Sequence, residues 1–91
     1  MLIALDYDGV ITENGAFWLR FIEMARGDGH EVICVTGRHK LEKDAGVLAF
    51  KRHMKFYFTG GRAKREFMDE QNIKPDVWID DNPYFIVNDA E

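Results

Sequence analysis

The chain opens with an apolar run, Leu2–Leu5, that stops at two carboxylates and a glycine: Asp6, Asp8 and Gly9. The run is too short for a helix and is apolar without interruption, which is typical of a strand buried on both faces of a parallel sheet. Acids at the carboxyl end of such a strand lie where open α/β sheets bind ligands. Gly9 permits a sharp turn and a close approach to a ligand. An acidic turn that merely closes a strand is the alternative for this stretch alone.

Strand-like and helix-like segments alternate along the rest of the chain. Apolar residues recur at helical spacing over 17–26, 39–53 and 63–71, and short β-branched or aromatic runs cover 31–36, 55–59 and 76–80. Segment 84–87 fits either a short fifth strand or a helical turn. Such alternation requires crossover connections, so it predicts a Rossmann-like three-layer α/β/α sandwich around a small parallel sheet. A chain of 91 residues has room for one such domain, spanning 1–91.

Each predicted strand ends in polar residues, and the carboxyl ends of parallel strands share one edge of a sheet. The residues expected at that edge are Asp6, Asp8, Thr36, Thr59, Asp80 and Asp81, with Arg38, Arg62 and Lys64 on nearby loops or helix starts. Several carboxylates with a hydroxyl and a cation suit phosphoryl transfer. Mg²⁺ takes carboxylate ligands and leaves positions open for phosphate oxygens.

Four motifs, in order, resemble those of the haloacid dehalogenase superfamily, over nearly the whole chain. They are Asp6-Tyr7-Asp8-Gly9-Val10, then Val32–Thr36 with Gly37-Arg38, then Lys64 at a helix start, and finally Ile79-Asp80-Asp81-Asn82-Pro83. The acid at Asp8 resembles the phosphatases of the superfamily and not its dehalogenases.

The resemblance implies an enzyme, a phosphatase that hydrolyses phosphomonoesters through an aspartyl-phosphate. Asp6 would attack phosphorus, and Asp8 would protonate the leaving oxygen and later activate water. Thr36 would bind the phosphoryl group, and Lys64 would steady Asp6 and the phosphate. The residues expected to bind substrate are Gly9, Gly37 and Arg38. An ordinary surface lysine is the alternative for Lys64, and a solvated cation is the alternative for Arg38.

The resemblance also implies Mg²⁺, held by Asp6, by the main-chain carbonyl of Asp8 and by the acids of the fourth motif. Successive residues of a strand point to opposite faces, so Asp80 and Asp81 are not both expected to be direct ligands. We favour Asp81 as the direct ligand of the metal and expect Asp80 to support the ligands without contacting the metal itself.

The spacing of the motifs leaves no room for a cap domain. Asp8 and Thr36 are separated by 27 residues, and so are Thr36 and Lys64. The first interval has room for a turn and one helix, and the second for one helix and one strand. This spacing resembles the capless branch of the superfamily. Water would then have to be excluded by a bulky substrate or by a neighbouring subunit of a homo-oligomer.

The charge is unevenly distributed. Residues 38–65 contain nine Lys and Arg against two acids, a formal charge of +7, whereas the rest of the chain carries −11. Solvated helix faces are one explanation. The other is a basic rim, including Arg38, Lys40 and Arg62, that attracts an anionic substrate. A nucleotide, a phosphorylated nucleic-acid end or a phosphorylated protein loop would suit such a rim, although the net charge of −4 disfavours long polyanions. We expect better catalysis on a nucleotide or nucleic-acid end than on small phosphomonoesters such as sugar phosphates.

Two other functions remain open. A phosphate- or partner-binding module could keep this site with little turnover. Receiver domains of signalling proteins also combine acids, Thr and Lys around Mg²⁺, but their paired acids follow the first strand, whereas here they follow the fourth.

The sequence predicts a cytoplasmic protein that does not enter a membrane. No apolar stretch is long enough to span a bilayer, and the N-terminus lacks the basic flank of a signal peptide. Cys34 is the only cysteine, and its apolar neighbours predict a buried thiol that is not a nucleophile.

Overall fold

The computed structural model describes residues 1–40 and 44–90 and contains a parallel sheet of four strands in the order β3-β2-β1-β4. The strands are β1 (Leu2–Leu5), β2 (Glu31–Thr36), β3 (Phe56–Phe58) and β4 (Val77–Ile79). Leu5 of β1 pairs with Cys34 of β2 and Ile79 of β4, so these strands reach the same edge of the sheet. The predicted strands and their parallel arrangement are confirmed.

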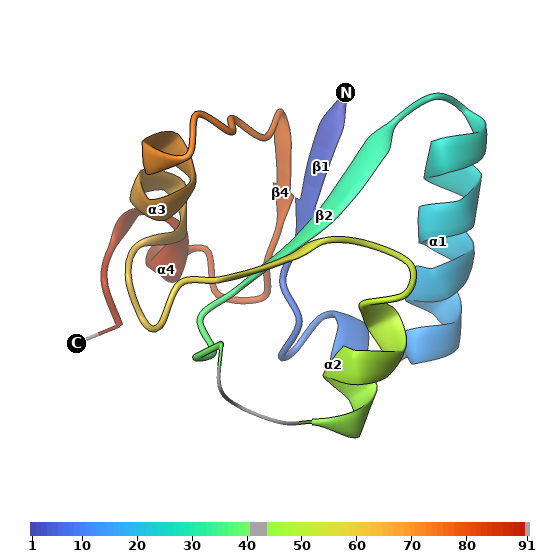
Figure 1. Ribbon diagram of the computed structural model, residues 1–91, viewed down its shortest axis with the longest axis horizontal. Helices are drawn as coiled ribbons and strands as arrows, with labels where there is room; N and C mark the ends of the chain where they lie inside the picture. The colour runs from blue at the N-terminus through green and yellow to red at the C-terminus, as the bar shows by residue number, and fades with distance from the viewer. Residues whose placement is uncertain (41–43, 91) are drawn as a thin grey trace.

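Helices cover both faces of the sheet, giving three layers (Figure 1). They are a 3-10 helix η1 (Ile11–Glu13), α1 (Gly15–Gly27), α2 (Ala45–Phe50), α3 (Lys64–Glu70) and α4 (Tyr84–Val87). Helices α1 and α2 lie on one side, and α3 and α4 lie on the other (Figure 1). Segment 84–87 forms the helical turn α4 and not a fifth strand, and its Ile86 side chain is buried.

Helix α2 begins later than the predicted helix over 39–53, of which 41–43 lie outside the described residues. The Asp44 side chain caps it by accepting hydrogen bonds from the backbone N–H groups of Gly46 and Val47. Gly46 lies in the first turn of this helix. A Cβ at this position would lie 2.2 Å from the Tyr7 hydroxyl oxygen, so only glycine fits there.

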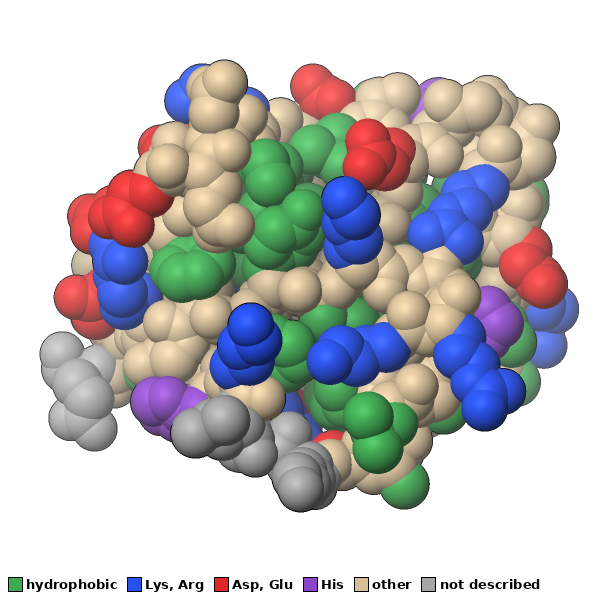
Figure 2. All heavy atoms as spheres, viewed as in Figure 1, with side chains coloured by type: hydrophobic (Ala, Val, Ile, Leu, Met, Phe, Trp, Pro, Cys, Tyr) green, Lys and Arg blue, Asp and Glu red, His purple; other side chains and the backbone are tan. Residues whose placement is uncertain are grey.

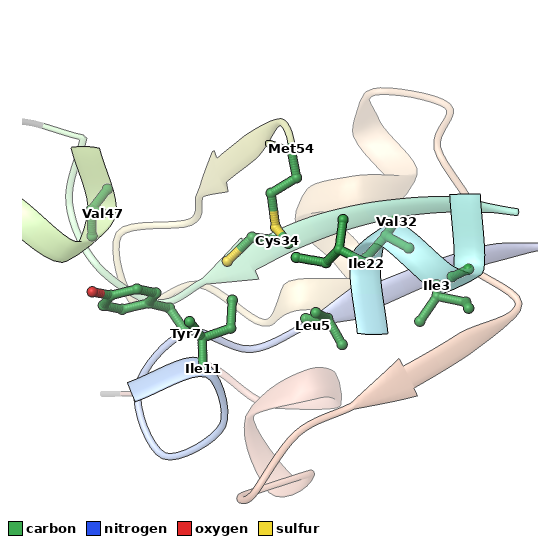
Figure 3. Packing of buried hydrophobic residues seen from close by; sticks show 10 residues of the cluster. Ile3, Leu5, Tyr7, Ile11, Ile22, Val32, Cys34, Val47 and Met54 are labelled. Carbon is green, nitrogen blue, oxygen red and sulfur yellow. The ribbon is translucent and has the colours of Figure 1, made fainter. Parts of the chain in front are cut away.

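Beyond their first residues the central strands β1 and β2 are buried on both faces, which explains their apolar sequences, whereas β3 and β4 are half-buried. Ile3 and Leu5 of β1 pack with Ile22 of α1 on one face (Figure 3), while Ala4 packs with Met68 of α3 on the other. Cys34 is fully buried in the first of these clusters, and burial raises the pKa of its thiol. The prediction of a core thiol is confirmed.

The connections between strands are short. Among the described residues, α1 is the only α-helix between β1 and β2, and α2 is the only one between β2 and β3. In the described part of the chain, no helix has the length and apolar character needed to cross a membrane.

Candidate functional site

Three carboxylates meet where β1 and β4 end. Asp6 follows β1, Asp80 and Asp81 follow β4, and the Asp6 N–H bonds the Ile79 carbonyl at 2.9 Å. One carboxylate oxygen from each acid lies within 4.8 Å of the other two. They open into a hollow of about 440 Å³ lined by Asp6, Asp8, Gly37, Arg38, Gly61, Arg62, Lys64, Asp80, Asp81, Asn82, Phe85 and Ala90.

Lys64 is the cation inside this cluster. Its Nζ lies 2.9 Å from Asp6 Oδ1 and 2.6 Å from Asp80 Oδ2, and its side chain is only 6% exposed. Burial by itself would lower the pKa of Lys64, but its hydrogen bonds to Asp80 and Asp6 outweigh burial and raise that pKa. Helix α3 begins at Lys64, so the predicted position at a helix start is confirmed, and the alternative of a surface lysine is wrong.

Asp6 holds its proton unusually strongly. Burial raises the pKa of its carboxyl group to about 7, against the opposing effect of the hydrogen bond and charge of Lys64. The neighbouring acids Asp81 and Asp80 raise it further. A divalent cation would relieve this crowding of carboxylates, and hard oxygen donors at this separation suit Mg²⁺. The residues present therefore fit the expected metal.

The expectation that Asp80 and Asp81 point to opposite faces is wrong. Strand β4 ends at Ile79, so the alternation of a strand does not extend to either acid, and both carboxylates reach Asp6. Asp80 is bound by Lys64 and accepts a hydrogen bond from the Asn82 N–H at 2.9 Å. Asp81 is exposed, and its carboxylate lies against Gly9.

Gly9 is required by this contact. It has a φ of +83°, and a Cβ at this position would lie 2.1 Å from Asp81 Oδ2. The loop after β1, which carries Asp8, therefore also contacts the Asp81 carboxylate and limits where it can lie. Gly37 also lines the hollow, with open space where its Cβ would be.

Asp8 is held by Arg38 and not by Lys64. Arg38 Nε and one terminal nitrogen each lie 2.8 Å from a different oxygen of the Asp8 carboxylate. The hydrogen bonds from Arg38 lower the pKa of Asp8. Arg38 is therefore an ion-pair partner of the candidate acid, and the alternative of a merely solvated cation is wrong.

Two residues that the sequence did not single out hold Arg38 in place. Its guanidinium lies 5.0 Å from the ring centroid of Tyr7 and 3.2 Å from Asp44 Oδ2. The Tyr7 hydroxyl in turn donates to Asp44 Oδ1 at 3.3 Å. The sequence placed Asp44 inside the predicted helix over 39–53, so it indicated neither the role of Asp44 as a cap nor its contact with Arg38.

The two threonines at the strand ends are buried. Thr36 is 0% exposed, and its hydroxyl accepts a hydrogen bond from the Arg38 N–H at 3.3 Å, so it lies beneath the hollow rather than in its wall. Thr59, at the end of β3, is also buried, and its hydroxyl has no hydrogen-bond partner among the described residues.

The basic rim is only partly present at the site. Arg62 lines the hollow but forms ion pairs with Glu66 and Glu70 of α3. Lys40 lines a different hollow, beside β3.

No family model, curated protein or solved structure matches this chain. The chemistry of the site is therefore inferred from its own residues.

Proposed function

We propose that this chain is a Mg²⁺-dependent phosphatase, a capless member of the haloacid dehalogenase superfamily, that hydrolyses a phosphomonoester through an aspartyl-phosphate on Asp6. One observation carries the proposal: Asp6 lies at a strand end with the carboxylates of Asp80 and Asp81 and the ammonium of Lys64 around it. Acids placed to hold a cation, beside a buried amine that contacts one of them, are the parts that phosphoryl transfer requires.

Asp6 is the nucleophile. One of its oxygens forms a bond to phosphorus while the bond from phosphorus to the leaving oxygen breaks. Water then attacks the phosphorus of the aspartyl-phosphate, which releases inorganic phosphate and restores the carboxylate. Lys64 steadies the Asp6 carboxylate at 2.9 Å and offsets negative charge that develops beside it.

Asp8 moves the proton in both steps. It donates a proton to the leaving oxygen and later accepts one from the attacking water, so its charge is restored after each cycle. The ion pair with Arg38 keeps Asp8 ionised in the free protein. A phosphate dianion entering the hollow competes with Asp8 for Arg38, and this competition frees the carboxyl group to take up the proton that it donates.

The acids Asp6 and Asp81, with the main-chain carbonyl of Asp8, would hold Mg²⁺, and Asp80 would orient Lys64. Bound there, the ion would neutralise the carboxylates and the phosphate oxygens. Thr36 would bind the phosphoryl group through its hydroxyl hydrogen, which stays free to donate because the hydroxyl oxygen accepts from the Arg38 N–H. Since Thr36 is fully buried, the loop above it must open for this contact to form.

The second candidate is a phosphate- or partner-binding module with little turnover. It is favoured by the Arg38–Asp8 ion pair, which holds the candidate acid in its ionised form. The two functions differ in whether phosphate is released.

Release of inorganic phosphate from a generic aryl phosphate ester tests the proposal. We expect hydrolysis with Mg²⁺, none in EDTA, and none from the folded Asp6→Asn variant, because the amide is not a nucleophile. Asp8→Asn should lose turnover on alkyl phosphates and keep part of the first step on aryl phosphates, whose leaving group needs less protonation. Activity in EDTA or in Asp6→Asn would refute the mechanism, and binding of phosphate without release would favour the module.

A further inference from the structure

A second charged feature lies along β3, away from the carboxylates. A hollow of about 460 Å³ at the amino end of β3 and another of about 240 Å³ beside the strand share Lys51, Phe56 and Tyr57 in their walls. The shared residues show that the two hollows are adjacent along β3, and together we call them the β3 groove.

The β3 groove is basic. Its walls contain the cations Arg26, Lys40, Lys51, Arg52 and Lys55, and no acid among the residues that the structure describes. None of these five forms an ion pair with another described residue. In this respect they differ from Arg38 and Arg62, whose charges are offset by acids. Their field is therefore available to an anion.

The groove is also aromatic and open. Phe56, Tyr57 and Phe58 of β3 are partly exposed, and Phe67 of α3 completes the wall. Strand β3 is at the edge of the sheet, so no further strand covers it. Figure 2 shows Lys and Arg side chains on this face, with hydrophobic side chains between them. Lys51 Nζ lies 5.5 Å from the ring centroid of Phe58, so cation and aromatic surface are directly adjacent.

The groove and the candidate site adjoin at one contact between their walls. Phe67 lines the groove, and the guanidinium of Arg62, which lines the site hollow, lies 5.7 Å from its ring centroid. Phe67 is one turn along α3 from Lys64, whose amine contacts Asp6.

These features suit one kind of ligand: an extended anion with flat apolar groups along it. Single-stranded nucleic acid places phosphates near cations and stacks bases on aromatic rings. An acidic polypeptide offers the charge without the flat groups. We propose that the β3 groove binds single-stranded nucleic acid and, on the assumption that the proposed phosphatase function is correct, presents a phosphorylated strand end to Asp6. The net charge of −4 disfavours long polyanions in general, but the described residues that line the groove include five cations and no acid, so the local charge is positive.

The test for binding uses the full chain and a labelled thymidine oligonucleotide of about 20 residues without a terminal phosphate, followed by fluorescence anisotropy. The variant Lys51→Ala/Arg52→Ala/Lys55→Ala removes three exposed cations of the groove. We expect its Kd to rise at least about tenfold at low salt and the slope of log Kd against log salt to fall by about 2, since each phosphate contact on a single strand contributes about 0.7.

The matched control is Arg20→Ala/Arg65→Ala/Lys74→Ala, which removes three exposed cations that do not line the groove. Its Kd should stay within about twofold of wild type. Equal weakening by both triple variants would overturn the proposal, because only net charge would then matter.

A second variant tests the aromatic part. Tyr57→Leu should weaken oligonucleotide binding at least about fivefold and leave binding of inorganic polyphosphate unchanged, because only bases stack. Equal loss of affinity for both ligands would overturn base recognition. A competition experiment gives a second check: if polyglutamate of the same charge displaces the labelled oligonucleotide as readily as unlabelled oligonucleotide does, base recognition is likewise overturned.

Presentation of the strand end is measured separately. The groove triple variant should keep wild-type activity on the aryl phosphate and lose at least about tenfold in kcat/KM on an oligonucleotide phosphorylated at either end. Unchanged kcat/KM on the oligonucleotide would overturn presentation. Groove-dependent binding in a protein that never releases phosphate from the aryl ester would support the groove and refute the phosphatase.

Discussion

Arg38 holds both carboxylate oxygens of Asp8 at 2.8 Å, although 30 positions separate the two residues in the sequence. The pair joins the loop after β1 to the loop after β2, directly over the buried Thr36 hydroxyl. The residue proposed to move protons is therefore held by a cation in the free protein. The proposed turnover would require this ion pair to open when phosphate binds.

Replacing Arg38 by Gln should raise the pKa of Asp8 toward its ordinary value. The hydrogen bonds and charge of Arg38 are what lower this pKa, so protonation of Asp8 should begin at a higher pH in the variant. The ¹³C shift of the Asp8 carboxyl carbon, followed against pH, measures the change. The control is Arg62→Gln, which disrupts ion pairs with Glu66 and Glu70 instead and should leave Asp8 unchanged. An identical Asp8 titration in Arg38→Gln and wild type would contradict the observed ion pair.

Binding of Mg²⁺ should release a proton below about pH 7. Burial raises the pKa of Asp6 above its unfolded value, so this group stabilises the metal-free fold at low pH and loses that contribution as the pH rises toward 7. The metal must displace the proton, so its Kd should rise up to about tenfold per pH unit below 7. Calorimetry in buffers of different ionisation enthalpy counts the protons that are released. In thermal melts, Mg²⁺ should raise the Tm more near pH 8 than near pH 5.5. Proton release that persists in Asp6→Asn would assign the linkage to another group.

Asp81→Asn and Asp80→Asn should impair the proposed hydrolysis in different ways. Asp81 has no cation bound to it among the described residues, so its loss should raise the Mg²⁺ concentration for half-maximal hydrolysis by about tenfold or more, with partial recovery at high Mg²⁺. Asp80 holds Lys64 at 2.6 Å, so its loss should lower the rate even at saturating Mg²⁺. Titration of activity with Mg²⁺ separates the two cases. The reverse pattern would make Asp80 the direct ligand.

Lys64→Met should destabilise the metal-free protein by about 3–5 kcal/mol, because it leaves two buried carboxylates without their cation. Urea denaturation measures the loss. Lys74→Met is the matched control, since Lys74 is exposed and, among the described residues, pairs only with Asp69, and it should cost at most about 1 kcal/mol. If the two substitutions cost the same, the buried network does not stabilise the fold as described.

The fold and much of the site could be predicted before the structure was known. Short apolar runs that alternate with helical segments allow few arrangements other than a parallel sheet, and the carboxyl ends of its strands meet by topology. That reasoning placed Asp6, Asp80 and Asp81 together. The position of Lys64 at the start of α3 followed in the same way, because helix starts after strand ends lie at this edge.

The sequence by itself determined which residue types reach the site, because strand and helix ends are set by local patterns. Tertiary structure alone decided which of them touch. Asp80 and Asp81 both lie close to Asp6 because β4 ends at Ile79. Arg38 binds Asp8 and Asp44 because the fold brings together the three segments that carry these residues. The same holds for the cations beside β3. Their charge is visible in the sequence, but only the packing of the chain decides that none of them pairs with an acid among the described residues.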